Sequence, residues 1–165
     1  MSIVNLRLTS FFFRPLLTVA AALVLSVSLH AADEAKGSGW TEKYDEAVAA
    51  STKSGLPILA DFTGSDWCGW CIKLHKEVFD TQEFKDWAAK NVVLLEVDFP
   101  NKKAQDDALK AKNKELAGKY EIHGYPTILI LDAEGKKLGK LGYKEGGPTV
   151  WIAEFTKQYK AGGGK

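Results

Sequence analysis

The sequence contains little cysteine and no excess of charge of either sign. Only two of its 165 residues are cysteines, too few for a domain held by several disulfides or for a four-cysteine zinc site. Its 22 basic and 21 acidic side chains leave a net charge of +1. Because such a chain has no positive field that would attract phosphates, we expect no nucleic-acid partner and no polybasic contact with a membrane surface.

The composition is otherwise that of a globular protein. Apolar residues make up 45% of the chain and charged residues 26%, which excludes extended disorder, collagen and coiled coil as descriptions of the whole chain. A chain of this length builds one domain more readily than two. The sequence therefore predicts one folded domain with its own apolar core.

The first part of the chain, residues 1–32, differs from the rest. Its only charges are Arg7 and Arg14, and residues 16–29 are uncharged and mostly Ala, Val and Leu. A membrane-spanning helix needs about 20 apolar residues, so this run is short. A basic start, a short apolar centre and small residues near Ala32 are typical of a secretory signal peptide. The alternative is an N-terminal anchor that is not cleaved.

Export would change how the two cysteines are interpreted. Residues 33–160 are then the folded domain, and the glycine-rich residues 161–165 are expected to be a flexible tail. We expect a periplasmic or secreted protein. In these compartments a pair of cysteines can be oxidised and can stay oxidised.

Apolar runs predict four strands, and amphipathic stretches predict helices between them. The predicted strands are 58–62, 92–97, 127–131 and 137–143. Two of the predicted helices are 40–51 and 68–79; a third helix ends at Gly118, and the last helix starts at 146–148. A further helix follows 68–79, with Asp80 as its N-cap and Glu83 as the capping-box partner. Crossover helices make the early strands parallel, while the short turn at 132–135 makes the last two antiparallel. The fold class is α/β, with a mixed central sheet of about four to five strands and helices on both faces.

Both cysteines lie in one Cys-x-x-Cys motif, directly after a predicted strand and at the start of a predicted helix. A helix N-terminus carries partial positive charge and unpaired N–H groups, which stabilise a thiolate at Cys68. Cys71 lies one turn further into the helix, where it can attack a mixed disulfide at Cys68. The motif therefore predicts thiol–disulfide exchange.

Two segments resemble the thioredoxin family. The run Ile58–Phe62 followed by Trp67-Cys68-Gly69-Trp70-Cys71 is similar to the first core strand and active site of that family, and Gly124-Tyr125-Pro126-Thr127 is similar to its second signature. Secreted thioredoxin-like proteins with Gly-Ser-Asp-Trp-Cys before the active site are the most similar. The resemblance covers residues 40–160 and implies a thioredoxin-like fold and a thiol:disulfide oxidoreductase that needs no cofactor beyond its dithiol.

The resemblance also implies catalytic roles. Cys68 would attack the substrate and Cys71 would resolve the mixed disulfide. Asp61 resembles the buried acid that exchanges protons with the second cysteine, and burial would raise its pKa. Two departures bear on Asp61: the gap to Cys68 is one residue longer than in thioredoxin, and Leu94 stands where thioredoxin has the lysine that pairs with this acid.

The residues expected to bind substrate flank the cysteines. Pro126 would be cis and face the disulfide, and the backbone of Tyr125 would pair with an extended substrate segment. Trp67 and Trp70 could form an exposed apolar surface that binds a client protein. For Trp67 the alternative is that its side chain packs against the rest of the domain. The insertion at 101–112 is a candidate element for partner recognition.

The direction of exchange depends on how strongly the Cys68 thiolate is stabilised. Strong oxidants have a histidine between the cysteines, and this chain has Gly69 and Trp70. We therefore favour a reductase over a disulfide-donating oxidant or isomerase. Its partners would be exported proteins with thiols or disulfides and a membrane electron donor, and we expect a monomer.

Two alternatives do not involve catalysis. One is a thioredoxin-fold binding or assembly module in which the cysteines are incidental. The other is a metal-handling protein, for which His75 could join Cys68 and Cys71 as a ligand, since it falls on the same arc of the helix as Cys71. Such a site would lack a fourth ligand. We expect no resident metal, and we interpret His75 as a partly buried histidine beside the active-site helix.

Overall fold

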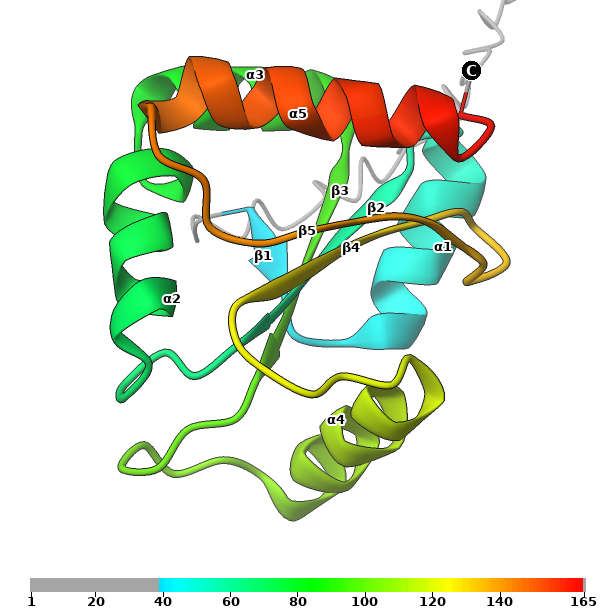
Figure 1. Ribbon diagram of the computed structural model, residues 1–165. Coiled ribbons are helices and arrows are strands. Elements are labelled where there is room, and N and C mark those ends of the chain that lie inside the picture. Colours follow the sequence, from blue (N-terminus) through cyan, green and yellow to red (C-terminus); the bar gives the residue numbers. More distant parts are fainter. Residues whose placement is uncertain (1–38, 165) are drawn as a thin grey trace, which may run out of the picture. The chain divides into compact units, whose positions relative to one another are not determined.

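The computed structural model describes residues 39–164 (Figure 1). The predicted signal peptide and residue 165 lie outside this range. The elements in chain order are β1 (Trp40–Thr41), α1 (Tyr44–Ser54), β2 (Ile58–Thr63), α2 (Gly69–Leu74), the π-helix η1 (His75–Phe79), α3 (Gln82–Asn91), β3 (Val93–Asp98), α4 (Asp107–Lys119), β4 (Thr127–Leu131), β5 (Lys137–Leu141) and α5 (Gly147–Ala161). None of the described helices has the length and apolar character needed to cross a membrane.

The strands form one mixed sheet in the order β1-β3-β2-β4-β5. β3 runs parallel to β1 and β2, whereas β4 is antiparallel to both β2 and β5. The parallel pairing of β2 with β3 and the antiparallel hairpin of β4 and β5 are as predicted. The five strands of the described sheet agree with the predicted number of about four to five. β2 is the central strand and is buried along its whole length. The residue in its middle, Asp61, lies opposite Glu96 of β3 and Ile128 of β4.

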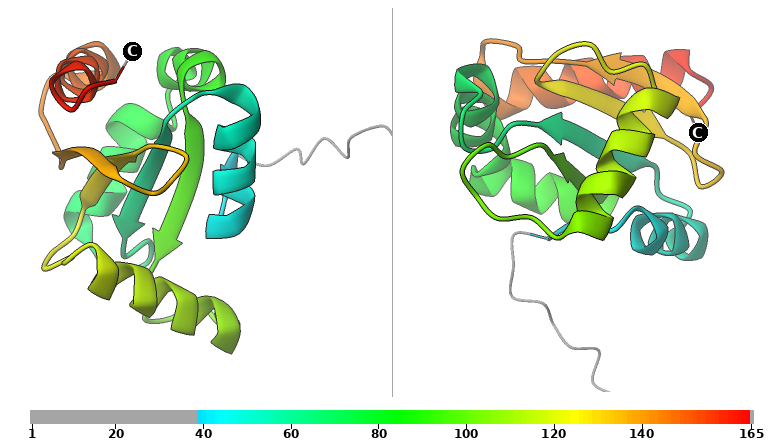
Figure 2. Two further views of the ribbon diagram at one scale, coloured as in Figure 1. Left: turned by 90° about the vertical axis from the view of Figure 1, so that its right-hand side faces the viewer. Right: turned by 90° about the horizontal axis from the view of Figure 1, so that it is seen from below.

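Helices cover both faces of the sheet, as predicted (Figure 2). Alternate residues of a strand point to opposite faces. Leu59 of β2 packs in a core with side chains of α2, η1, α3 and α5, whereas Ala60 packs in a second core with side chains of α1 and α4. Asp61 follows Ala60 and therefore lies on the face covered by α2 and η1.

The start of the domain differs from the prediction. The sequence predicts a helix from Trp40, but Trp40 and Thr41 pair with Leu94 and Leu95 at the edge of β3, and the helix begins at Tyr44. This strand of two residues depends on pairing with a distant strand. The local helical spacing therefore could not reveal it.

The predicted capping box after the active-site helix is wrong. Thr81 caps α3 in place of Asp80, and its hydroxyl accepts the Phe84 N–H at 3.3 Å. The Asp80 N–H still bonds to the His75 carbonyl at 2.8 Å, so Asp80 belongs to the end of the preceding π-helix. Glu83 does not reach back to the cap, because its carboxylate accepts the hydroxyl of Thr149 at 2.6 Å.

The active-site helix has two parts. Residues predicted as one helix form α2 up to Leu74 and then the wider π-turn of η1. A π-turn inserts an extra residue per turn and shifts the direction of the side chains that follow. At the other end of the chain, α5 includes Ala161, which the sequence places in the tail.

Candidate active site

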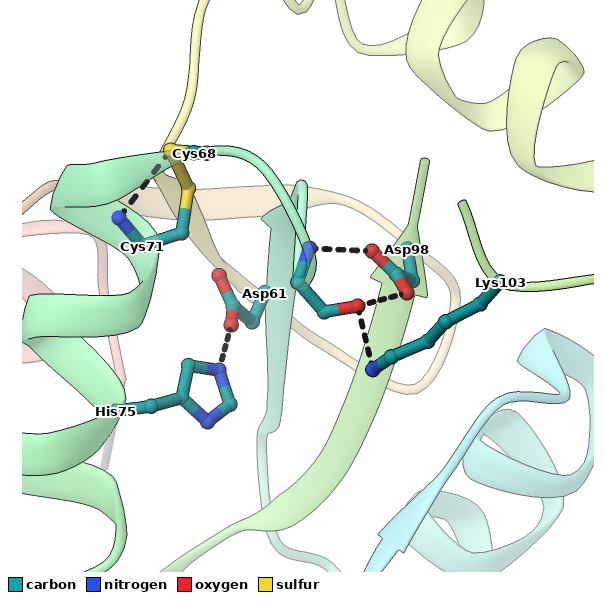
Figure 3. Close-up of polar contacts among 7 residues, drawn as sticks. Asp61, Cys68, Cys71, His75, Asp98 and Lys103 are labelled. Carbon is teal, nitrogen blue, oxygen red and sulfur yellow. Dashed lines mark hydrogen bonds and ion pairs between the residues drawn. A yellow bond between two sulfur atoms is a disulfide. The ribbon is translucent and has the colours of Figure 1, made fainter. Parts of the chain in front are cut away.

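Cys68 and Cys71 form a disulfide at the N-terminus of α2 (Figure 3). Cys68 is the N-cap residue in an extended conformation, and its sulfur accepts the backbone N–H of Cys71 at 3.2 Å. Cys68 is 7% exposed and Cys71 is 1% exposed. A thiolate formed at Cys68 on reduction would face the same N–H group and the positive end of the helix. The geometry therefore suits Cys68 as the nucleophile and Cys71 as the inner, resolving cysteine.

Asp98 holds the start of the loop before the cysteines. One oxygen of its carboxylate accepts the backbone N–H of Ser65 at 2.9 Å, and the other accepts the Ser65 hydroxyl at 2.5 Å. The ammonium of Lys103 also donates to the Ser65 hydroxyl, at 2.9 Å. Because Asp98 ends β3, these bonds tie the active-site loop to the strand next to β2 (Figure 3).

Asp66 binds the segment that follows β3. Its carboxylate accepts the backbone N–H groups of Asn101, Lys102 and Lys103 at 2.9, 2.6 and 2.8 Å. These bonds, that of Asn101 foremost, lower the pKa of Asp66 below its ordinary value. The beginning of the 101–112 insertion is therefore fastened to the residue two positions before Cys68.

Trp67 packs beside the disulfide. Its indole N–H donates to the Phe99 carbonyl at 2.7 Å, and its ring meets that of Tyr125 edge-on at 5.8 Å between centroids. Gly64 makes room for it, since a Cβ there would lie 2.5 Å from the indole. Trp67 is nevertheless 44% exposed, so it packs and also leaves part of its indole open to solvent; that a client binds there stays a prediction.

Trp70 is the most exposed large apolar residue of the described chain, at 57%. Its ring lies 5.2 Å from that of Tyr143, and the Lys73 ammonium lies 5.3 Å from the first ring and 4.9 Å from the second. The Tyr143 hydroxyl donates to Glu77 at 2.6 Å, which raises the pKa of Tyr143. The sequence gives no sign that Trp70 packs on Tyr143, because Tyr143 lies far along the chain.

The Tyr125–Pro126 peptide bond is cis, which confirms that part of the prediction. The Thr127 hydroxyl donates to the Gly124 carbonyl at 2.8 Å and closes the turn that leads into β4. Tyr125 is half-buried between Trp67 and Phe99, with ring centroids 5.8 and 5.3 Å away. This turn and the active-site loop thus meet through their aromatic rings.

Asp61 lies in the centre of the sheet and is fully buried. Its Oδ2 lies 2.9 Å from Nε2 of His75, while its Oδ1 has no hydrogen-bond partner. In Figure 3 that free oxygen points toward the side of the disulfide where Cys71 lies. Burial raises the pKa of Asp61 despite the hydrogen bond and charge of His75. The predicted rise in pKa is confirmed, and its cause is burial.

His75 is the residue that sequence reasoning missed as the partner of Asp61. Burial lowers its pKa, but the hydrogen bond and charge of Asp61, with Glu96 and Asp80, outweigh burial and raise it. The signal in the sequence was its position four residues after Cys71, on the helix face that looks toward β2. Among residues 39–164, no three or more His, Cys, Asp or Glu side chains are grouped to hold a metal ion.

The sequence family described as "Thioredoxin-like domain" matches residues 44–149. The chain belongs to the thioredoxin-like family. It is 39% identical to "Disulfide bond reductase DsbH" of Chlamydia pneumoniae, covering 72% of each chain. It is 32% identical to "Thioredoxin-related protein DsbJ" of the same organism, covering 76% of this chain and 38% of DsbJ.

A solved structure supports the same assignment. The protein titled "DsbH Oxidoreductase" superposes with a TM-score of 0.69 at 39% sequence identity, covering 72% of this chain and 83% of the other. The predicted thioredoxin-like fold is therefore confirmed. Family membership, these relatives and the cysteine pair identify a thiol:disulfide oxidoreductase. The binding module and the metal-handling protein are thereby set aside as primary functions.

Proposed function

We propose that this oxidoreductase works outside the cytoplasm as a reductase of disulfides in other exported proteins. The observation that carries the proposal is the disulfide at the start of α2, with Cys68 at the N-cap and Cys71 inside. Gly69 and Trp70 between the cysteines offer no histidine to stabilise the Cys68 thiolate further. A less stabilised thiolate makes the dithiol a better electron donor.

The reaction would proceed in two steps. The Cys68 thiolate attacks one sulfur of a client disulfide, forming a mixed disulfide and releasing the first client thiolate. Cys71 then loses its proton to Asp61 and attacks the Cys68 sulfur. This breaks the bond to the client, forms the Cys68–Cys71 disulfide and releases the second client thiolate. The client gains two electrons, and the dithiol supplies them without an added cofactor.

Renewed turnover would need an electron donor that reduces the Cys68–Cys71 disulfide. For an exported protein, we propose a membrane protein that carries dithiol electrons to this side of the membrane. This proposal depends on residues 1–32 acting as a signal peptide. It also depends on the mature domain working as a monomer, so that the disulfide stays open to client and donor in turn.

The client would lie across two aromatic surfaces beside Cys68. On one side, a groove of about 530 Å³ is lined by the apolar residues Trp67, Phe99, Pro100 and Tyr125 together with Asn101, Lys103, Ala104, Gln105 and Lys110. On the other side lie Trp70 and Tyr143. The backbone of Tyr125, held by the cis bond to Pro126, would pair with an extended client segment. The groove's charged residues are lysines, which favours client segments with carboxylates near the disulfide.

The reduction potential of the Cys68–Cys71 couple tests the direction of exchange. The exported protein would be equilibrated in dithiothreitol or glutathione buffers, with Cys68→Ser as the control that cannot form the couple. A potential near that of thioredoxin, about −270 mV, supports the reductase. A potential nearer about −120 mV would assign a disulfide donor instead. The absence of a reversible couple would contradict both.

A further inference from the structure

Asp61 has a single route for its proton among the described residues. Its side chain is fully buried, and its one hydrogen bond joins Oδ2 to Nε2 of His75 at 2.9 Å. The other oxygen, Oδ1, is buried without a partner. A carboxylate that takes a proton from a neighbouring thiol must later lose it, and a buried group cannot hand it directly to water.

His75 connects this carboxylate to the surface. Its side chain is 24% exposed, whereas that of Asp61 is not exposed at all. The imidazole packs against the rings of Trp40 and Phe79, with centroids 5.9 and 5.1 Å away. These rings fix the orientation of the imidazole, so that one nitrogen faces Asp61. The imidazole can therefore accept a proton on one side and release one on the other.

The other charged groups that act on the pair are acids. Glu96 and Asp98 face it from β3, and Asp80 faces it from the end of η1. β4 contributes the apolar Ile128 opposite Asp61. When protonated, His75 therefore brings a positive charge to a cluster of carboxylates. His75→Gln would remove that charge and leave these acids around Asp61.

We propose that His75 is a positioning residue that keeps Asp61 ready to accept a proton and conducts that proton to solvent while Cys71 resolves the mixed disulfide. The inference rests on the proposed role of Asp61. The Cys71 S–H proton passes to Oδ1 of Asp61, and a proton leaves for water through the imidazole. The electron pair left on Cys71 forms the new S–S bond, and the client sulfur leaves with the pair of the broken bond.

The effect of His75 on the pKa of Asp61 has a definite direction. Protonated His75 favours the carboxylate form of Asp61, so His75→Gln would raise the pKa of Asp61 further. At neutral pH less carboxylate would then be present to accept the Cys71 proton. Resolution should slow at neutral pH and recover as the pH rises.

The small aromatic disulfide DTNB separates the two steps. Attack by Cys68 releases a first coloured thiolate, and attack by Cys71 on the mixed disulfide releases a second. Stopped-flow traces of the reduced protein with limiting DTNB would be recorded from about pH 5 to about pH 9. Wild type, His75→Gln, Asp61→Asn and the double variant would be compared. His123→Gln is the matched control, because His123 is exposed in a loop.

In His75→Gln we expect the second phase to slow at neutral pH, by up to about tenfold for each unit by which the pKa of Asp61 rises, and to rejoin wild type at alkaline pH. The first phase should not change. In the Asp61→Asn background, His75→Gln should have no further effect. Equal effects in both backgrounds, or a loss that high pH does not restore, would overturn the proposal. A missing first phase would instead refute Cys68 as the nucleophile, which belongs to the proposed function.

Discussion

The Asp98 carboxylate accepts both the backbone N–H and the hydroxyl of Ser65, at 2.9 and 2.5 Å. Asp98 is the last residue of β3 and is buried, whereas Ser65 lies three residues before Cys68. The two residues join the end of a core strand to the active-site loop. The loop's position therefore depends on a strand that is distant in sequence.

Asp98→Ala should destabilise the fold by about 1–3 kcal/mol, because it leaves the Ser65 N–H without its partner in a part-buried site. Urea unfolding of the oxidised protein measures this loss. Asp45→Ala is the control, because Asp45 is exposed in the first turn of α1 and should change stability by about 0.5 kcal/mol or less. Equal losses in the two variants would contradict a special role for the Asp98–Ser65 contact.

Asp66→Ala should release the segment 101–103 from the active-site loop, because three backbone N–H groups lose their acceptor together. Limited digestion with trypsin reports this directly, since Lys102 and Lys103 are cleavage sites within the segment. We expect faster cutting there and unchanged cutting elsewhere. Asp107→Ala, in the first turn of α4, should not affect it. Unchanged cutting after Lys102 in Asp66→Ala would show that other contacts hold the segment.

The residues with local signals could be predicted from the sequence. The Cys68–Cys71 motif and the strand before it follow from short patterns, whereas the cis bond before Pro126 follows from the resemblance to the thioredoxin family; the structure contains all three. The final hairpin was also predictable, because an apolar run, a turn and a second run adjoin in sequence. Short patterns of this kind are enough to predict the fold class and the cysteine pair.

The remaining features depend on contacts between distant segments. β1 exists only through its pairing with β3. The sequence predicts residues 68–79 as one ordinary helix, so it could indicate the helix face on which His75 lies but neither the π-turn of η1 nor the contact of His75 with Asp61. Asp66 was visible within the motif, but its role requires the segment at 101–103. Patterns within one segment cannot specify such partners.

The stability of the oxidised protein should fall as the pH rises from mildly acidic to alkaline, in part because of Asp61 and His75. Both groups have a raised pKa in the fold. A raised pKa means that the folded state binds the proton more tightly than the unfolded state. The stability it contributes is present below the unfolded pKa and is lost as the pH passes the folded pKa.

Asp61→Asn should remove much of this dependence and should be more stable than wild type at alkaline pH, because it eliminates a buried charge. The measurement is the free energy of unfolding in urea at several pH values, expressed as the difference between variant and wild type so that surface groups cancel. Glu134→Gln is the control, since Glu134 is exposed in the turn between β4 and β5. A difference that does not vary with pH would contradict the raised pKa of Asp61.

Phe99→Ala should impair reduction of protein clients while sparing small disulfides. Phe99 lines the groove beside Cys68 and packs on Tyr125, yet Trp67 bonds to its backbone carbonyl, which the substitution keeps. If a client side chain occupies the groove, loss of the Phe99 ring should lower kcat/KM for insulin reduction about tenfold, which corresponds to about 1.4 kcal/mol of binding. The rate with DTNB should not change, because DTNB is too small to depend on the groove.

Val150→Ala, which trims an exposed apolar residue of α5, is the matched control. Equal losses with insulin and DTNB would mean that Phe99 supports the active site itself and that clients bind elsewhere.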